Sequence, residues 1–465
     1  MYRLARRDSV HLRRQKREWW RDAFWSTAPV MPADRGELLR AGVFHTPRNP
    51  FREKKALEFF ADGGLLIQDG RIAACGEYTD VHGSHPGVAV RDLRGGYLLP
   101  GLVDTHIHFP QIRVLGGLGR QLLDWLEFVA LPEEARMADV PYARETARRF
   151  VRALASHGTT TALVFGSHFE SATAALFTAA ERSGLRLVSG LVVSDRLLRP
   201  ELHQTPADAY RDCTHLIRDY HGRGRLLFAV TPRFALSTSE AMLEVCQTLT
   251  REHDGLRFQT HMNENAMEMQ QVAKLFPWAK DYLAVYERYE LSRPGAVLAH
   301  NVHASDSELD RLAASGTAVS HCPCSNAMLG SGLFPLRRHV EAGVRCALGT
   351  DVGGGTGFGI LKEALQAYAL QRLAPDGMLL SPAHLLYLAT RAGAEALRLE
   401  HDIGDFATGK SADFVYLRAP EGSPLESVVE RAESLESVLA ALFTLAGSES
   451  VAEVRVGGER VHDDP

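Results

Sequence analysis

The segment GLVDTHIHFPQ, residues 101–111, joins an apolar run to two histidines that flank one isoleucine. Gly-Leu-Val is typical of a buried strand, and side chains along a strand point alternately to opposite faces. His106 and His108 are therefore expected to point into the same space, while Ile107 points away from it. Two interpretations remain open at this stage: either hydrogen bonds in a loop satisfy both imidazoles, or the pair forms the first half of a metal site.

Seven further strand-like segments follow this one, and amphipathic stretches lie between them. Residues 142–158 (YARETARRFVRALASHG), for example, carry apolar residues at helical spacing and end at a glycine. Eight such repeats over about 300 residues predict an α/β fold, a closed (β/α)8 TIM barrel, with a doubly wound open sheet as the alternative. The strand segments are GLVDTHIH, TTTALVFGSH, LRLVSGLVVSD, RLLFAVTPRF, LRFQTHMNE, AVLAHNVHAS, TAVSHCPCSN and RCALGTDVGG.

Polar residues lie at the carboxyl ends of most of these segments, which favours the barrel, because barrels of this class place their active sites there. Three imidazoles and one carboxylate at one barrel end form a ligand set suited to Zn²⁺ or Fe²⁺. The polar strand-end residues are His106, His108, Arg233, His261, Glu264, His300, His303, His321 and Asp351.

One metal is expected in each chain rather than two. A second metal would need a bridging ligand, typically a modified lysine or a carboxylate from the fourth strand. The sequence has no lysine between Lys55 and Lys274, and RLLFAVTPRF contains neither Asp nor Glu.

Both ends of the chain have a β-rich texture that differs from the middle. Segments such as GGLLIQDGRIAACG near the start and VAEVRVGGERV near the end are short β-like runs punctuated by glycine. We therefore predict a small β-sandwich built from residues 36–98 and 401–465, which bracket a barrel of residues 99–400.

Residues 1–35 are expected to be a basic extension outside the fold. Their first 25 residues crowd Arg and Lys with Trp19, Trp20 and Trp25. A basic arm or a membrane-surface helix is the alternative interpretation. A secretory signal is not expected, because the segment has no apolar core.

The overall composition is that of an ordinary globular protein, with 45% hydrophobic and 23% charged residues and a net charge of −5. This charge balance does not favour a nucleic-acid partner. No apolar run approaches the length of a membrane-spanning helix. Six scattered cysteines favour a reducing, cytoplasmic compartment.

Seven segments follow one another along the chain in this order: PGLVDTHIHFPQ, QLLDWLE, VTPRFALSTSE, THMNEN, LFPWAKDYLAVYE, HCPCSNAMLGSG and LGTDVGGG. These segments resemble the amidohydrolase superfamily and, within it, the guanine deaminases. They occur in the family's order over about residues 45–460. Two departures are visible: TGFG, residues 356–359, carries Gly where the family commonly has Ser, and Cys324 stands where the family often has Thr or Asn.

This resemblance implies the hydrolytic deamination of guanine to xanthine and ammonia in purine metabolism, by a cytoplasmic homodimer with one Zn²⁺ per chain. It implies Glu264 as the proton shuttle, Asp351 as the acceptor of the water proton, and His300 as the residue that polarises the water. The implied zinc ligands are His106, His108, His261 and Asp351, and the implied substrate-binding residues are Gln111, Arg233, Phe234, His261 and Asp351.

The alternatives are a related amidohydrolase that acts on a pterin, 8-oxoguanine, a triazine or an adenosine-type ring, and a non-catalytic scaffold relative. The scaffold is the weaker one, because this chain keeps all four implied ligands and Glu264.

Two motifs suggest other functions and are set aside. Residues 404–411 (GDFATGKS) fit the phosphate-binding-loop pattern, but a strand-like segment follows where that motif needs a helix. HCPC, residues 321–324, offers one imidazole and two thiols, but no matching half of a second zinc site is visible. No role is assigned to His168, His303 or Cys324.

Overall fold

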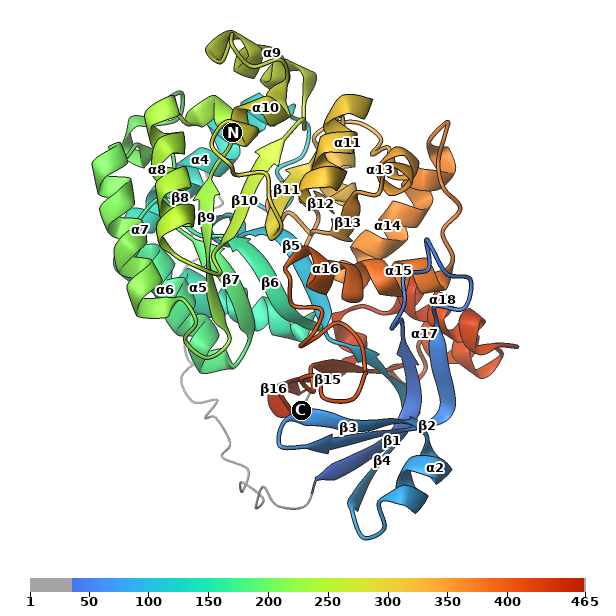
Figure 1. Ribbon diagram of the computed structural model, residues 1–465. Coiled ribbons are helices and arrows are strands. Elements are labelled where there is room, and N and C mark those ends of the chain that lie inside the picture. Colours follow the sequence, from blue (N-terminus) through green and yellow to red (C-terminus); the bar gives the residue numbers. More distant parts are fainter. Residues whose placement is uncertain (1–35, 464–465) are drawn as a thin grey trace, which may run out of the picture.

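The computed structural model describes residues 36–463. It contains a barrel of parallel strands surrounded by helices, with a separate, mainly antiparallel sheet below it (Figure 1). The predicted (β/α)8 barrel with a small β domain from both chain ends is thereby confirmed. The predicted N-terminal extension lies outside the described residues.

All eight predicted barrel strands are present and run parallel in the order of the sequence. A two-residue strand, β8 (Val192–Val193), adds one further pairing, to β9. The eight strands are β5 (Leu102–His108), β6 (Thr159–Phe165), β7 (Arg186–Gly190), β9 (Leu226–Pro232), β10 (Arg257–Met262), β11 (Ala296–His300), β12 (Ala318–His321) and β13 (Arg345–Leu348).

The first and last barrel strands, β5 and β13, are the two ends of the hydrogen-bonded path. Side-chain hydrogen bonds join them. Thr105 donates its hydroxyl to the carbonyl oxygen of Leu348 at 2.8 Å. The buried Asp104 carboxylate accepts the backbone N–H of Thr350 at 3.1 Å and its hydroxyl at 2.5 Å. These bonds fix the end of β5 beside the loop that follows β13, where His106 and Asp351 lie.

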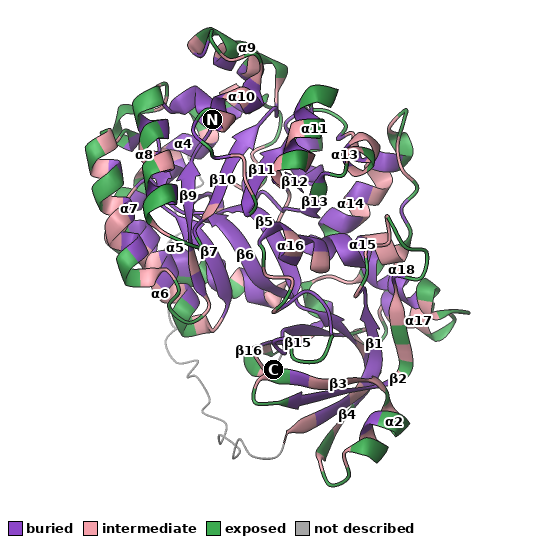
Figure 2. Cartoon of the chain, in the orientation of Figure 1, coloured by how far each residue is buried: buried purple, intermediate pink, exposed green. Residues whose placement is uncertain are grey.

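Helices cover the outside of the barrel with one apolar face inward. In α5 (Val140–Ser156), Ala147, Phe150 and Leu154 are buried, while Arg148 and Arg149 are exposed, as the helical spacing predicts (Figure 2). The other helices around the barrel are α6 (Glu170–Ser183), α7 (Pro206–Tyr220), α8 (Glu240–Glu252), α9 (Ala266–Leu275), α10 (Tyr282–Glu287), α11 (Asp306–Ser315), α12 (Pro323–Met328), α13 (Leu336–Ala342), α14 (Ile360–Leu373), α15 (Pro382–Ala389) and α16 (Arg391–Ala396).

The first strand-to-helix connection, between β5 and α5, is long and partly helical. It contains α3 (Leu122–Trp125), a π-helical turn at Leu126–Ala130, and α4 (Leu131–Ala135). Single π-helical turns are frequent at functional sites. This connection carries Gln111 and Glu134 and forms one wall of the site described below.

The small sheet contains seven strands in the spatial order β16-β15-β14-β4-β1-β2-β3, in one continuous hydrogen-bonded path. Its strands are antiparallel to their neighbours except for the parallel pair β1 and β4. They are β1 (Glu37–His45), β2 (Glu58–Gln68), β3 (Arg71–Glu77), β4 (Ala89–Pro100), β14 (Phe414–Arg418), β15 (Val451–Val456) and β16 (Glu459–Asp463), with α2 (Tyr78–Ser84), α17 (Pro424–Glu430) and α18 (Leu435–Leu445) between them.

The strand β14 is buried on both faces and links the two parts of the molecule. Its alternate residues Phe414 and Tyr416 belong to the core of the small sheet. Val415 and Leu417, which point the other way, belong to the core that continues into the barrel. None of the described helices is long and apolar enough to cross a membrane.

Candidate active site

Two histidines from β5 and one aspartate from the loop after β13 lie together at the carboxyl end of the barrel. His106 Nε2 and His108 Nε2 are each 3.3 Å from Asp351 Oδ1. All three side chains are buried. The alternation of side chains along β5 brings both imidazoles to one carboxylate, as the His-x-His spacing predicts.

His261, at the end of β10, closes the other side of this cluster. Its Nε2 lies 3.2 Å from Nε2 of His108. Its Nδ1 lies 2.6 Å from the carbonyl oxygen of Arg233. Because a carbonyl only accepts, the His261 proton resides on Nδ1, and the Nε2 lone pair faces the cluster.

His300, at the end of β11, joins the same group. Its Nε2 lies 3.5 Å from Glu264 Oε2 and 4.0 Å from Asp351 Oδ2. Its Nδ1 lies 2.9 Å from Asn326 Oδ1. The ligand atoms of His106, His261 and His300 lie within 4.8 Å of one another, as do those of His106, His108 and Asp351. The structure therefore brings the four predicted ligands together and adds His300 beside them.

The protonation states of these residues suit a divalent metal. Burial lowers the pKa of His106, His108 and His261, so these imidazoles are neutral at neutral pH. Burial alone would raise the pKa of Asp351, but His106 and the neighbouring histidines hold it well below its usual range. His106 Nε2 is buried and makes no hydrogen bond with any residue from 36 to 463. Neutral imidazoles beside an ionised carboxylate are the states in which these groups bind metals.

Glu264, which follows β10, is buried beside this cluster. Its Oε1 accepts the hydroxyl of Ser331 at 3.3 Å. Burial, together with the negative charge of Asp351, raises the pKa of Glu264 to about 8. A carboxyl group with this pKa carries a proton at neutral pH and can donate it.

Two of the site residues, His300 and Asp351, and Asn263, which precedes Glu264, have left-handed backbone conformations without being glycine. The φ angles are 51° at Asn263, 70° at His300 and 48° at Asp351. Such conformations cost about 1 to 3 kcal/mol each and cluster at functional sites.

A second group of polar residues lies next to the cluster and centres on Glu134, which the sequence analysis missed. Gln111 and Arg233 both donate to its carboxylate, at 2.7 and 2.9 Å. His168 Nδ1 lies 3.4 Å from the same group. The Phe234 ring lies 6.2 Å from the ring of His261, centroid to centroid. The structure thus brings together Gln111, Arg233 and Phe234, three of the five residues expected to bind the purine.

Three further residues were not singled out from the sequence. Asn326, whose Oδ1 lies 2.9 Å from His300 Nδ1, is part of the segment HCPCSNAMLGSG, which carries the family resemblance. Ser331 contacts Glu264, and its carbonyl oxygen is held by His303 Nε2 at 2.8 Å. Phe165 at the end of β6 packs 4.6 Å from the His108 ring, centroid to centroid. Apolar and hydroxyl residues of this kind carry no sequence signal that separates them from ordinary core residues.

His321, Cys322 and Cys324 of the HCPC motif are packed in the protein interior. His321 stacks on Phe334 with ring centroids 4.3 Å apart, and burial lowers its pKa to about 3. Its ring nitrogens have no hydrogen-bond partner within the described chain. Cys322 and Cys324 are buried and free, and the Cys324 N–H donates to Glu363 at 3.0 Å.

The phosphate-loop-like segment leads into a strand, β14, rather than into a helix. Its Lys410 is buried, and its ammonium donates to Asp405 at 2.7 Å and to the carbonyl oxygen of Glu400 at 2.6 Å. The lysine that would bind phosphate is therefore already occupied.

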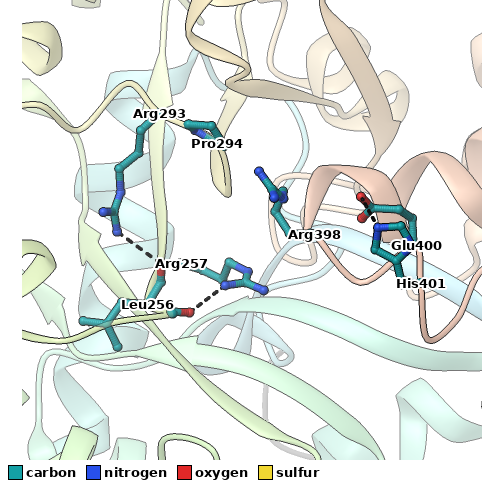
Figure 3. A pocket seen from close by; sticks show the side chains of 8 residues that line it. Leu256, Arg257, Arg293, Pro294, Arg398, Glu400 and His401 are labelled. Carbon is teal, nitrogen blue, oxygen red and sulfur yellow. Dashed lines mark hydrogen bonds and ion pairs between the residues drawn. The ribbon is translucent and has the colours of Figure 1, made fainter.

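A hollow of about 330 Å³ at the opposite end of the barrel is lined by Arg257, Arg293 and Arg398 (Figure 3). Arg257 donates to the carbonyl oxygen of Leu397 at 2.7 Å, at the end of α16. Arg293 donates to that of Leu256 at 3.2 Å. Arg257 and Arg293 therefore cap carbonyl oxygens where elements begin and end. Glu400 and His401 also line the hollow and lie 3.8 Å from each other.

Comparison with known proteins places the chain among enzymes of one kind. Residues 97–461 match the model of the amidohydrolase family. A probable guanine deaminase of Deinococcus radiodurans is 56% identical over 428 residues, 91% of this chain and 98% of that protein. The structure of E. coli guanine deaminase has a TM-score of 0.88 at 37% identity, covering 92% of this chain and 99% of that one. The structure of guanine deaminase from C. acetobutylicum, with guanine bound in its active site, has a TM-score of 0.84 at 25% identity, covering 92% and 100%.

Proposed function

Because this chain belongs to the amidohydrolase family, within its guanine deaminases, we propose that it hydrolyses guanine to xanthine and ammonia. The observation that carries the proposal is the position of Glu264. A buried carboxyl group with a pKa near 8 lies 3.5 Å from His300 and beside a cluster of metal-ligand residues. Such a group donates a proton to a heterocycle at neutral pH.

We propose that His106, His108, His261 and Asp351 hold one Zn²⁺, with His300 beside it. Their neutral imidazoles and ionised carboxylate support this ligand set. When bound, zinc lowers the pKa of a water ligand to about 7, which makes a nucleophile available at neutral pH.

The chain's own residues supply the proton transfers. Asp351 accepts a proton from the attacking water as a bond forms between the water oxygen and C2 of guanine. Glu264 donates its proton to ring N3, takes up the proton of the new C2 hydroxyl group as the C2=O bond forms, and passes that proton to the amine that leaves C2. The proton held by Asp351 then returns Glu264 to its protonated state. His300, whose Nε2 faces both carboxyl groups, orients the water. Water is consumed, the C2–N bond breaks, and ammonia leaves.

Substrate recognition falls to the residues around Glu134. Arg233 can only donate, so its guanidinium suits O6 and N7 of guanine and would oppose the 6-amino group of adenine. Gln111 lies along the same edge, and Phe234 packs beside the ring. We therefore expect guanine to be deaminated and adenine to be rejected.

The test is a substrate panel measured by ammonia release and by ultraviolet detection of the product, run beside a metal determination. Guanine should be converted, whereas adenine, cytosine, a pterin and a triazine should not. Chelation should abolish turnover, and one equivalent of Zn²⁺ should restore it. A preference for another ring, or two tightly held metals that are both needed, would overturn these assignments. We also propose that the protein is a cytoplasmic homodimer that acts in purine catabolism. Light scattering of the purified protein measures its mass and so tests the homodimer.

A further inference from the structure

Glu134 is a buried carboxylate that lies between the two polar residues proposed to recognise the purine. It belongs to α4 in the connection from β5 to α5, and only 2% of its surface is exposed. Its Oε1 accepts from Gln111 Nε2 at 2.7 Å and from Arg233 Nη1 at 2.9 Å, and its Oε2 is 3.2 Å from the same Nη1.

The carboxylate determines which end of the Gln111 amide faces it. An ionised carboxylate only accepts hydrogen bonds, so the amino end of the amide must face Glu134. The amide oxygen is then directed away. It is buried without a hydrogen-bond partner among the described residues, and it lies against Gly353, where an added Cβ would be 2.1 Å from it. Gln111 is therefore held as a hydrogen-bond acceptor.

The Glu134 carboxylate also orients the Arg233 guanidinium and compensates its positive charge in the absence of substrate. Nη1 is engaged by Glu134, while the guanidinium has further N–H groups on Nε and Nη2. The backbone of Arg233 is fixed independently, because its N–H donates to Val193 and its carbonyl oxygen holds His261. The guanidinium direction is thus tied to the metal-ligand cluster.

We propose that Glu134 is a positioning residue that sets the hydrogen-bond polarity of the purine pocket. It makes Gln111 present an acceptor and Arg233 present donors, an arrangement that matches N1–H and O6 of a 6-oxopurine. Glu134 itself does not contact the substrate. This inference rests on the proposed guanine deaminase function and specifies how that function selects the 6-oxo form.

The test compares guanine with 2-aminopurine, which keeps the 2-amino group but has no O6 and carries a lone pair at N1. The purified zinc enzyme should prefer guanine strongly. Glu134→Gln removes the charge and offers both a donor and an acceptor, so Gln111 is free to rotate. We expect kcat/KM for guanine to fall about 10²-fold, mainly through KM, with metal content unchanged. The ratio of kcat/KM values for guanine and 2-aminopurine should fall at least about tenfold.

The adjacent residue offers a matched control. Glu133 is also buried, but it pairs with Arg136 and Tyr142 and has no contact with Gln111 or Arg233. Glu133→Gln should leave the guanine to 2-aminopurine ratio at the parent value. The inference is overturned if Glu134→Gln keeps that ratio within about twofold, or if Glu133→Gln changes it equally. If the parent enzyme does not act on guanine at all, it is the proposed function that fails.

A double-mutant cycle distinguishes positioning from a merely structural effect. If Glu134 acts through Gln111, then Glu134→Gln should change the ratio less in a Gln111→Ala background than in the parent. Additive effects would contradict this route. Should Glu134→Gln fail to fold, Glu134→Asp keeps the buried charge for Arg233 while shortening its reach toward Gln111. That variant should bind metal and show a reduced ratio, and a ratio equal to the parent's would refute the proposal.

Discussion

Glu264 is the residue at which proton transfer can be separated from metal binding. Glu264→Gln keeps the shape of the side chain but removes the carboxyl proton, so turnover should fall about 10² to 10⁴-fold. Metal content, measured by elemental analysis, should stay at the parent value because the four proposed ligands are untouched. By contrast, His261→Ala should lose the metal itself. Near-normal turnover of Glu264→Gln would assign the proton transfer to another group.

Arg233 combines a role in recognition with a role in stability. Arg233→Ala should raise KM and lower kcat/KM for guanine while the zinc remains bound. It also removes the cationic partner of the buried Glu134, and breaking a buried pair in this way costs about 3 to 5 kcal/mol. Denaturant unfolding should show this loss of stability. A variant as active on guanine as the parent would remove the guanine assignment and leave the metal-dependent hydrolase in place.

The proposed ligands could be grouped from the sequence because residue type and position at a strand end can both be read from short segments. Residue type and position at a strand end place His106, His108, His261 and Asp351 at one end of the barrel. Glu134 gave no such signal, because it lies on a short helix outside the strands and pairs with Arg233 across 99 sequence positions. Two adjacent glutamates in LPEEA are typical of a solvated helix start, and only the fold shows that Glu134 reaches Gln111 and Arg233.

At the scale of elements, the turn after β13 sets the position of Gln111. Gly353 has a φ of 112°, and a Cβ there would lie 2.1 Å from Oε1 and 2.6 Å from Cβ of Gln111. Gly353→Ala should therefore displace Gln111 and raise KM for guanine at least about tenfold, the cost of one misplaced hydrogen bond. Steady-state kinetics with metal analysis measures both effects.

Gly357 provides the control for backbone strain in the same loop. It also has a positive φ, 149°, but an added Cβ would meet nothing within 4 Å. Gly357→Ala shares the conformational strain without the collision, so its KM should stay near the parent value. Equal effects of the two substitutions would mean that strain alone, and not contact with Gln111, controls the site.

The barrel was predictable at this scale because the spacing of apolar residues identifies each strand and helix. The long connection between β5 and α5 was not, since short helices and a π-helical turn lack a repeat long enough to recognise. The sequence also did not predict that the small domain is one continuous sheet. In that sheet β4 pairs with β1 on one side and with β14, from the other end of the chain, on the other side.

For the whole molecule, the C-terminal strands are expected to be indispensable. Ending the chain at about residue 400 removes β14, β15 and β16, which leaves one edge of β4 unpaired. It also removes Phe414 and Tyr416 from the core of the small sheet. The exposed edge and apolar faces should make the protein insoluble. Expression followed by centrifugation checks this, and a soluble, active truncation would contradict it.

The central place of β4 also has a consequence for how the chain is made. Ribosomes add about 5 to 20 residues per second, and more than about 300 residues separate the end of β4 from the start of β14. The nascent polypeptide therefore carries a half-paired strand for roughly 15 to 60 seconds while the whole barrel is translated. During that interval, chaperones or neighbouring nascent chains have access to an edge that the finished protein no longer offers.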